Sequence, residues 1–197
     1  NVASAQTFKI GISGTGMEFD DAKGTEESKG RTVSETDSLA AAVGSIFVEA
    51  NIMDMVSVGI DYIPYTIEGE TVTNTRRSNK GIFIGDNTAS VDIDDHITAY
   101  VLAPIGDSGV YIKAGYSEAK VNVSENMFRG TTYSDETMIG GHLSIGFEKD
   151  MSAFFLRGEA GMSEYGSVES NSSSGATRIK ANLGSGIHAR LSVGKSF

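Results

Sequence analysis

The sequence contains no cysteine, no tryptophan and only two prolines among its 197 residues. Without cysteine the chain has no disulfide scaffold and no thiolate metal site. Positive charge is also scarce, because 16 Lys and Arg residues stand against 26 Asp and Glu residues, which gives a net charge of −10. A nucleic-acid partner is therefore not expected, since a surface that binds nucleic acid is basic.

Long hydrophobic runs are missing too. No stretch approaches the roughly 18 uninterrupted apolar residues of a membrane-spanning helix, and the most apolar windows are as short as Ser45–Glu49. The first residues lack a basic segment followed by an apolar core, so we expect no intact signal peptide, although Ala3-Ser4-Ala5 has the A-x-A form of a cleavage site. A membrane barrel stays open, because its alternating strands carry a much weaker hydropathy signal.

What the chain does contain is alternation of apolar and polar residues with a period of two, which is typical of β-strands. In the last and clearest segment, Ile179, Leu183, Ile187 and Leu191 share one parity, and Arg190 has the other. The alternating segments lie at about 8–13, 38–51, 56–63, 91–103, 110–117, 139–147, 154–162 and 179–197.

The connections between these segments are alternately long and short. We therefore predict that residues 1–197 form a single barrel domain, whose even number of antiparallel strands puts both termini on the side of the tight turns. The predicted long loops lie at about 18–37, 65–90, 121–136 and 165–177, and the predicted tight turns at about 52–55, 104–109 and 148–151.

Two segments allow a second interpretation. Leu39–Val43 could begin a helix, since alanine is the best helix former, but Gly44 and the β-branched residues beyond it favour a strand. Gly184-Ser185-Gly186 could be a hairpin, but the unbroken parity across it favours one bent strand.

With this pattern the chain resembles the small eight-stranded outer-membrane barrels of the OmpA transmembrane-domain, OmpX and Opa group. Its sharpest element is the final strand: such barrels end in alternating apolar residues and a phenylalanine that the barrel-assembly machinery reads, and Leu191, Val193 and Phe197 match that signal. Lys195 stands where the group often has an aromatic residue. The resemblance implies an all-β, eight-stranded antiparallel up-and-down transmembrane β-barrel in the bacterial outer membrane, with extracellular long loops and periplasmic termini.

Parity also places charged and histidine side chains on the face opposite the apolar one, and so inside the barrel. Because eight strands leave little room, we expect them to form a structural network of ion pairs and hydrogen bonds that plugs the lumen. A gated path for protons or small ions is the alternative. The predicted interior network consists of Lys9, Glu49, Asp61, Lys113, His142, Arg157, Glu159 and Arg190, with His188 of the same parity.

Asp92, Asp94, Asp95 and His96 form the densest cluster of acids and histidine, at the predicted rim. Their oxygens could contact a Ca²⁺ or Mg²⁺ ion, although the spacing does not fit a calcium-binding loop. Outer-membrane proteases place aspartates and a histidine at such a rim, but they draw them from several strands. We expect no enzyme, no cofactor and no resident metal.

The sequence thus predicts a structural or surface-interaction outer-membrane barrel with acidic extracellular loops. The alternatives are a narrow channel for small solutes or ions, a soluble lipocalin-like binding barrel with its faces inverted, and an enzyme with a site at the rim. The expected partners are outer-membrane lipid and lipopolysaccharide, the barrel-assembly machinery, and neighbouring barrels or other surface ligands, but no nucleic acid. Divalent cations could bridge the acidic loops to lipopolysaccharide.

Overall fold

The computed structural model describes residues 8–28, 31–53, 56–68, 72–77, 81–126, 133–173, 175 and 177–197. In these ranges no helix is long and apolar enough to cross a membrane. The strands are β1 (Phe8–Ser28), β2 (Arg31–Met53), β3 (Val56–Tyr62), β4 (Val72–Arg77), β5 (Phe83–Pro104), β6 (Val110–Asn126), β7 (Glu136–Asp150), β8 (Phe155–Asn171) and β9 (Thr177–Ser196).

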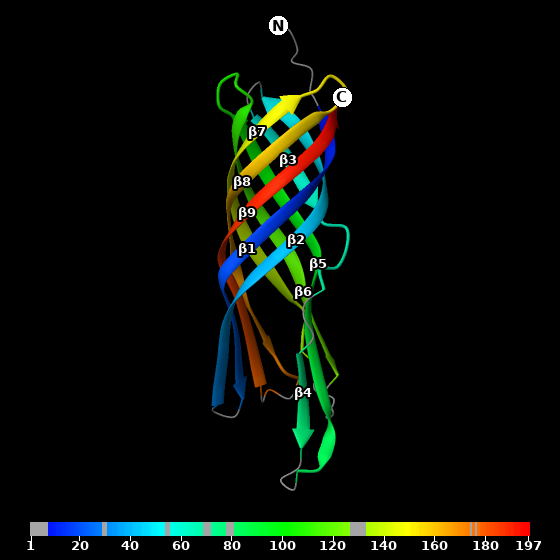
Figure 1. Ribbon diagram of the computed structural model, residues 1–197, viewed down its shortest axis with the longest axis vertical. Coiled ribbons are helices and arrows are strands. Elements are labelled where there is room, and N and C mark those ends of the chain that lie inside the picture. Colours follow the sequence, from blue (N-terminus) through cyan, green and yellow to red (C-terminus); the bar gives the residue numbers. More distant parts are fainter. Residues whose placement is uncertain are drawn as a thin grey trace.

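Eight of these strands form a closed antiparallel ring. The order β3-β2-β1-β9-β8-β7-β6-β5 is hydrogen-bonded throughout, and β3 also pairs with β5, from Ser57 opposite Leu102 to Tyr62 opposite Ile97. The remaining strand, β4, pairs with the outer part of β5 and stands apart from the ring (Figure 1). The prediction of an all-β, eight-stranded antiparallel barrel is confirmed.

Both ambiguous segments belong to continuous strands. Leu39–Val43 lies within β2 and pairs residue by residue with β1. Gly184-Ser185-Gly186 lies within β9, where Gly184 has a φ of 66° that only glycine adopts without strain. The backbone bends there without ending the strand.

The predicted long loops differ from the structure, because several strands run far beyond the apolar part of the sequence. β1 and β2 remain paired out to Ser28 opposite Arg31, through most of the predicted loop at 18–37. β8 and β9 likewise extend into the predicted loop at 165–177. These extensions project from the end of the barrel opposite the termini (Figure 1). Backbone pairing needs no apolar side chains, so the loss of apolar alternation marks the end of the apolar wall rather than of the strand.

The short turns lie at the other end, which we call the turn end; the extended strands mark the hairpin end. The turn between Pro104 and Val110 falls where it was predicted, with Gly106 and Gly109 at φ 62° and 82°. The turn predicted at 148–151 lies three residues later, because β7 continues to Asp150 and β8 begins at Phe155. The turn predicted at 52–55 lies partly outside the described residues.

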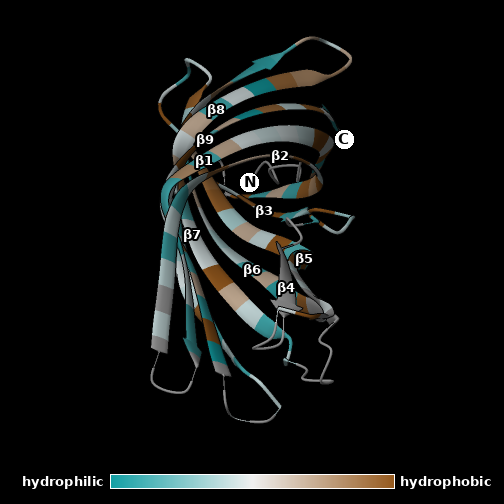
Figure 2. Cartoon of the chain, turned by 60° about the horizontal axis from the view of Figure 1, so that its bottom comes forward, coloured by the Kyte–Doolittle hydropathy of each residue, from teal (hydrophilic) through white to brown (hydrophobic). Residues whose placement is uncertain are grey.

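The two faces of the barrel wall differ in chemistry. Apolar side chains cover the outside, and several are exposed over most of their surface, including Leu191 at 73%, Leu143 at 63% and Ile187 at 62%. Bands of hydrophobic and hydrophilic residues follow one another along the strands of the ring (Figure 2). The buried polar residues, among them Glu49 and Arg157, point inward. A soluble lipocalin-like barrel would require the opposite arrangement.

Glycine makes room for the large rings inside. Each of six interior aromatic rings lies against a glycine of the adjacent strand, in the space that a Cβ atom would need. This close approach explains why so narrow a barrel can enclose rings and charged side chains together. The pairs are Phe47 with Gly11, Tyr100 with Gly59, Tyr111 with Gly146, Tyr165 with Gly140, Phe19 with Gly186 and Phe155 with Gly194.

Candidate functional site

The candidate site is the lumen, and its turn end is built around Arg157. The Arg157 guanidinium donates two hydrogen bonds to the Glu49 carboxylate, at 2.7 and 2.8 Å, and a third to Glu148. Lys9 also reaches Glu148, with an Nζ–Oε1 distance of 2.5 Å. The Phe155 ring lies beneath the guanidinium, 4.9 Å from ring centroid to Cζ. The Arg157 and Glu49 side chains retain 3% and 0% of their exposed surface, so this pair is desolvated and bidentate.

A second group of ion pairs lies further along the lumen. Lys113 Nζ is 2.5 Å from Glu159 Oε2, and the Tyr111 hydroxyl donates to the other oxygen of Glu159 at 2.7 Å. Arg190 forms an ion pair with Asp61, which also accepts a hydrogen bond of 3.0 Å from a serine hydroxyl of β2. Every carboxylate here therefore has both an opposite charge and further hydrogen-bond donors.

The interior charges of these two groups balance. Each acid has at least one basic partner within ion-pair distance, and each base has at least one acidic partner. Buried charges are tolerated when they are paired in this way. The set comprises four acids, Glu49, Asp61, Glu148 and Glu159, and four bases, Lys9, Lys113, Arg157 and Arg190.

Toward the hairpin end, a layer of histidine and serine replaces the ion pairs. The sequence has three histidines, and strands β5, β7 and β9 bring all of them into this layer. Ser163 Oγ lies 2.8 Å from Nδ1 of both His142 and His188. His142 Nε2 is hydrogen-bonded to Ser117, whose hydroxyl is 2.6 Å from that of a β5 threonine. His96 Nε2 is 2.9 Å from the Tyr165 hydroxyl.

A small cavity and an apolar plug flank the histidine layer. The cavity, of about 60 Å³, is bordered by the three histidines on one side and by the second group of ion pairs on the other. The plug closes the hairpin end with four buried residues, Phe19, Val121, Met138 and Tyr165. Among the described residues, buried side chains therefore occupy the lumen on both sides of this cavity, which has room for a few water molecules.

Comparisons with known proteins agree on the fold. No family model matches the chain, and no curated protein matches its sequence. Among solved structures, the outer membrane protein OprG from Pseudomonas aeruginosa superposes with a TM-score of 0.56 at 11% identity, covering 98% of this chain and 96% of that one. The fold is that of an outer-membrane β-barrel. Neisserial surface protein A, NspA, has 10% identity and a TM-score of 0.47, with 96% and 97% covered. The outer membrane protease OmpT from Escherichia coli has 12% sequence identity and a TM-score of 0.47, with 97% of each chain covered.

All eight residues assigned to the interior by parity lie in the lumen of this barrel. Seven of them, together with Glu148, make up the two ion-paired groups. The eighth, His142, belongs to the histidine layer with His188. Parity thus identified the inward face, whereas the pairing of the charges required the three-dimensional register.

The cluster at Asp92–His96 is divided by a β-bulge. Between Asp94 and Ile97 the register of β5 against β6 shifts, and Asp95 has a φ of 49°. His96 faces the lumen with Thr98, which has the same parity, whereas the bulge turns Asp94 and Asp95 to the outer side, where they bind Asn122 and Lys120. In the part of the chain that the structure describes, no group of three or more acidic or histidine side chains has a metal-binding arrangement. The suggested cation contact at Asp92, Asp94 and Asp95 gains no support.

The contact between Lys120 and Asp95 is exposed to solvent, unlike the ion pairs of the lumen. The Lys120 ammonium donates to Asp95 at 2.6 Å. The hydrogen bond and the negative charge of Asp95 together raise the pKa of Lys120 above its ordinary value.

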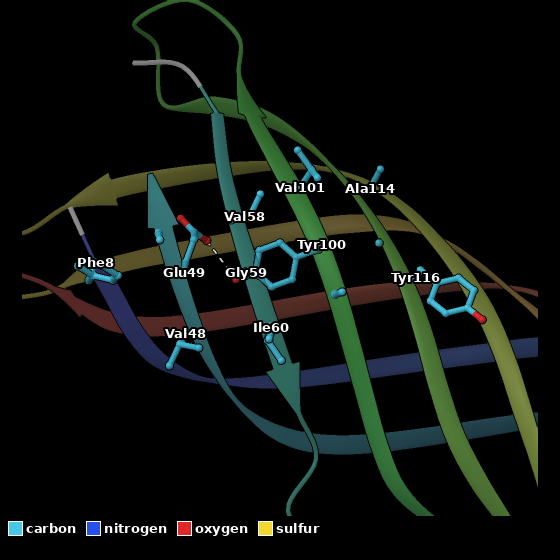
Figure 3. A pocket seen from close by; sticks show the side chains of 13 residues that line it. Phe8, Val48, Glu49, Val58, Gly59, Ile60, Tyr100, Val101, Ala114 and Tyr116 are labelled. Carbon is cyan, nitrogen blue, oxygen red and sulfur yellow. Dashed lines mark hydrogen bonds between the residues drawn. The ribbon is translucent and has the colours of Figure 1, made fainter. Parts of the chain in front are cut away.

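Sequence reasoning missed several interior groups. Glu148 was assigned to the turn predicted at 148–151. Because β7 continues to Asp150, Glu148 belongs to the strand, where it shares the inward parity of His142. Tyr100 donates a 3.1 Å hydrogen bond to Glu49 from behind the β3 glycine, Gly59 (Figure 3). Tyr111 likewise has the parity of Lys113, and that shared parity was the available signal.

The residues of the suggested assembly signal lie in β9 and just beyond it. Leu191 and Phe197 are exposed on the outside, and Val193 is less so. The backbone of Phe197 exchanges hydrogen bonds of 2.8 and 3.2 Å with that of Phe8, which joins this strand to β1 at the turn end.

Proposed function

We propose that the protein is a structural or surface-interaction component of a bacterial outer membrane, which spans the bilayer with its ring of eight strands. One observation carries the proposal: the apolar residues face outward around the ring while the charged residues are paired inside. An exposed apolar surface of this extent is stable in lipid and not in water.

The first test is physical. The folded chain should partition into detergent, and its migration on a gel should change after boiling, because the hydrogen-bonded ring resists the gel detergent until it is heated. A chain that stays monodisperse in plain buffer would contradict membrane insertion.

We propose the orientation in which the hairpin end is extracellular and the turn end is periplasmic. Because the chain has no cysteine, single substitutions report the side directly. In intact cells, a membrane-impermeant maleimide should label Thr25→Cys on the β1–β2 extension, and it should label Ser108→Cys in a short turn only after the outer membrane is permeabilised. Labelling of Ser108→Cys in intact cells, with Thr25→Cys protected, would reverse the orientation.

A filled lumen favours a closed barrel over a channel. The ion pairs of Arg157 and Arg190 cross the interior, and the apolar plug closes the hairpin end. In planar bilayers we expect no conductance steps above the background of empty lipid. Regular steps that persist in several preparations would favour the channel alternative.

Catalysis forms no part of this proposal. The one serine hydrogen-bonded to His142 Nε2, Ser117, is fully buried, and the adjacent cavity of about 60 Å³ has no room for a peptide.

The proposed partners are outer-membrane lipid and lipopolysaccharide, the barrel-assembly machinery through Leu191, Val193 and Phe197, and neighbouring barrels or other surface ligands at the extended strands. Acidic residues such as Glu26 and Glu27 are exposed there, which supports bridging by divalent cations. Chelation should then loosen these extensions, as seen in faster hydrogen exchange; identical exchange with and without chelator would contradict bridging.

A further inference from the structure

The histidine layer differs from the rest of the lumen in having no acid of its own. Asp61 and Glu159, the carboxylates nearest the cavity, are already committed to Arg190 and Lys113. With neutral histidines the interior charges balance, so any proton that the layer takes up adds a positive charge with no partner. A buried charge without a partner is strongly unfavourable.

The hydrogen-bond donors and acceptors around His142 and His188 favour one additional proton, shared by the pair, over two. Their Nδ1 atoms share a single hydroxyl, that of Ser163. If one ring is protonated, it donates to Ser163, whose hydroxyl donates to the other ring. If both rings are protonated, two N–H groups meet one oxygen, and the Ser163 proton has no acceptor.

The surroundings of the pair supply positive charge but no free negative charge. Strand β6 contributes Lys113, β9 contributes Arg190, and β5 contributes His96, while the carboxylates of β3 and β8 are paired. β8 also contributes Tyr165, and β1 and β2 border the cavity with uncharged residues, Thr15, Met17, Val43 and Ser45.

The cavity itself has unused hydrogen-bonding capacity. Ser144, which is only 4% exposed, borders it with an Oγ atom that has no hydrogen-bond partner among the described residues. His96, which borders the cavity from β5, two strands away from Ser144 in the ring, also has a ring nitrogen, Nδ1, with no hydrogen-bond partner among the described residues. A hydroxyl and an imidazole N–H beside two cationic side chains suit a small anion.

We propose that this cavity binds one small monovalent inorganic anion, of the size of chloride, together with one proton held by His142 and His188. The anion neutralises the charge that the proton brings, and the proton favours the anion, so each increases the affinity for the other. A volume of about 60 Å³ admits one such ion. The proposal goes beyond the surface function and does not depend on what the hairpins contact.

The test compares the Tm of the folded barrel in non-ionic detergent, in sodium chloride and in sodium gluconate at equal concentration. Gluconate is too large for the cavity. At about pH 4.5 we expect the Tm in chloride to exceed that in gluconate by roughly 2–4 °C, and at about pH 8 we expect no difference. The same difference at both pH values, or none at about pH 4.5, would overturn the proposal.

Variants locate the effect. Ser144→Ala should remove the chloride dependence while the histidines remain, and His188→Gln should remove its pH dependence. Ser108→Ala, in an exposed turn, is the control and should behave like the parent chain. A chloride response that survives in both Ser144→Ala and His188→Gln would contradict the site.

If either cavity variant fails to fold, crystals of the unsubstituted chain still test the proposal. Crystals grown in bromide at about pH 4.5 should show an anomalous peak in the cavity, and crystals grown at about pH 8 should not. Absence of the peak at the lower pH would overturn the proposal.

Discussion

At the turn end of the lumen, Glu49 accepts three hydrogen bonds, two from Arg157 and one from Tyr100. At the hairpin end, one serine hydroxyl serves two histidine rings, and His96 and Ser144 each have an atom with no hydrogen-bond partner among the residues that the structure describes. Ion pairs between opposite charges connect the strands at the turn end. Hydrogen bonds between neutral groups connect them at the hairpin end, where some donors and acceptors are unused by the described residues. We therefore expect substitutions at the turn end to cost more stability than substitutions at the hairpin end, because they leave a buried charge without its partner.

The largest effect should follow from Arg157→Met. It leaves Glu49 and Glu148 without the guanidinium that they share, and breaking a buried pair costs about 3–5 kcal/mol. Denaturant unfolding of the barrel in lipid vesicles, followed by the gel-mobility change, measures the free energy of unfolding. The control is Arg178→Met, because the exposed Arg178 lies 3.7 Å from Glu169 and should contribute less than about 1 kcal/mol. Equal losses would remove the distinction between buried and exposed pairs.

Gly146→Ala tests the close packing of the turn end. Its Cβ would collide with the Tyr111 ring, whose hydroxyl holds Glu159, so we expect a loss of about 1–3 kcal/mol. Gly141→Ala on the same strand is the matched control, since nothing lies within 4 Å of the added carbon. If both variants unfold at the same denaturant concentration, the ring does not require the glycine.

His142→Gln addresses the hairpin end. It removes the ring that links Ser117 to Ser163, and the loss of neutral hydrogen bonds should cost about 1 kcal/mol. The same unfolding assay applies. A loss as large as that of Arg157→Met would show that the two halves contribute equally, against the comparison drawn above.

The smallest effect should come from Glu169→Gln on the extended strands. Glu169 lies 3.2 Å from Lys180, but both side chains are more than 40% exposed, so the free energy of unfolding should change by less than about 0.5 kcal/mol. A larger change would show that the extensions contribute to the stability of the ring.

The alternation of residues predicted the ring and its inward face well. Lys113, Arg157 and Glu159 lie inside because the parity of each strand separates charged from apolar side chains, and the apolar face is the outer one. Where the parity breaks, prediction failed. The bulge at Asp95 turns Asp94 outward although it shares the parity of His96, which faces the lumen, and no residue pattern announces such an extra residue.

The loop boundaries were wrong for a related reason. Beyond the apolar wall, both faces of a strand meet water, so a paired strand such as Thr32–Ser38 reads as a polar loop. Its backbone hydrogen bonds with β1 leave no mark on side-chain polarity. The sequence signal reports where the apolar wall ends, and pairing continues past that point.

The sequence by itself determined which side chains share a face of the barrel wall, because the period of a strand is two. It also determined which reactive side chains are available, with three histidines and no cysteine. The structure decided which of the two faces points inward, since it buries the charged side chains and exposes the apolar ones. Only the tertiary structure decided which acid meets which base, and that the three histidines share one layer. These contacts join residues far apart in the chain, such as Glu49 and Arg157, and the stagger of the strands around the closed ring sets them.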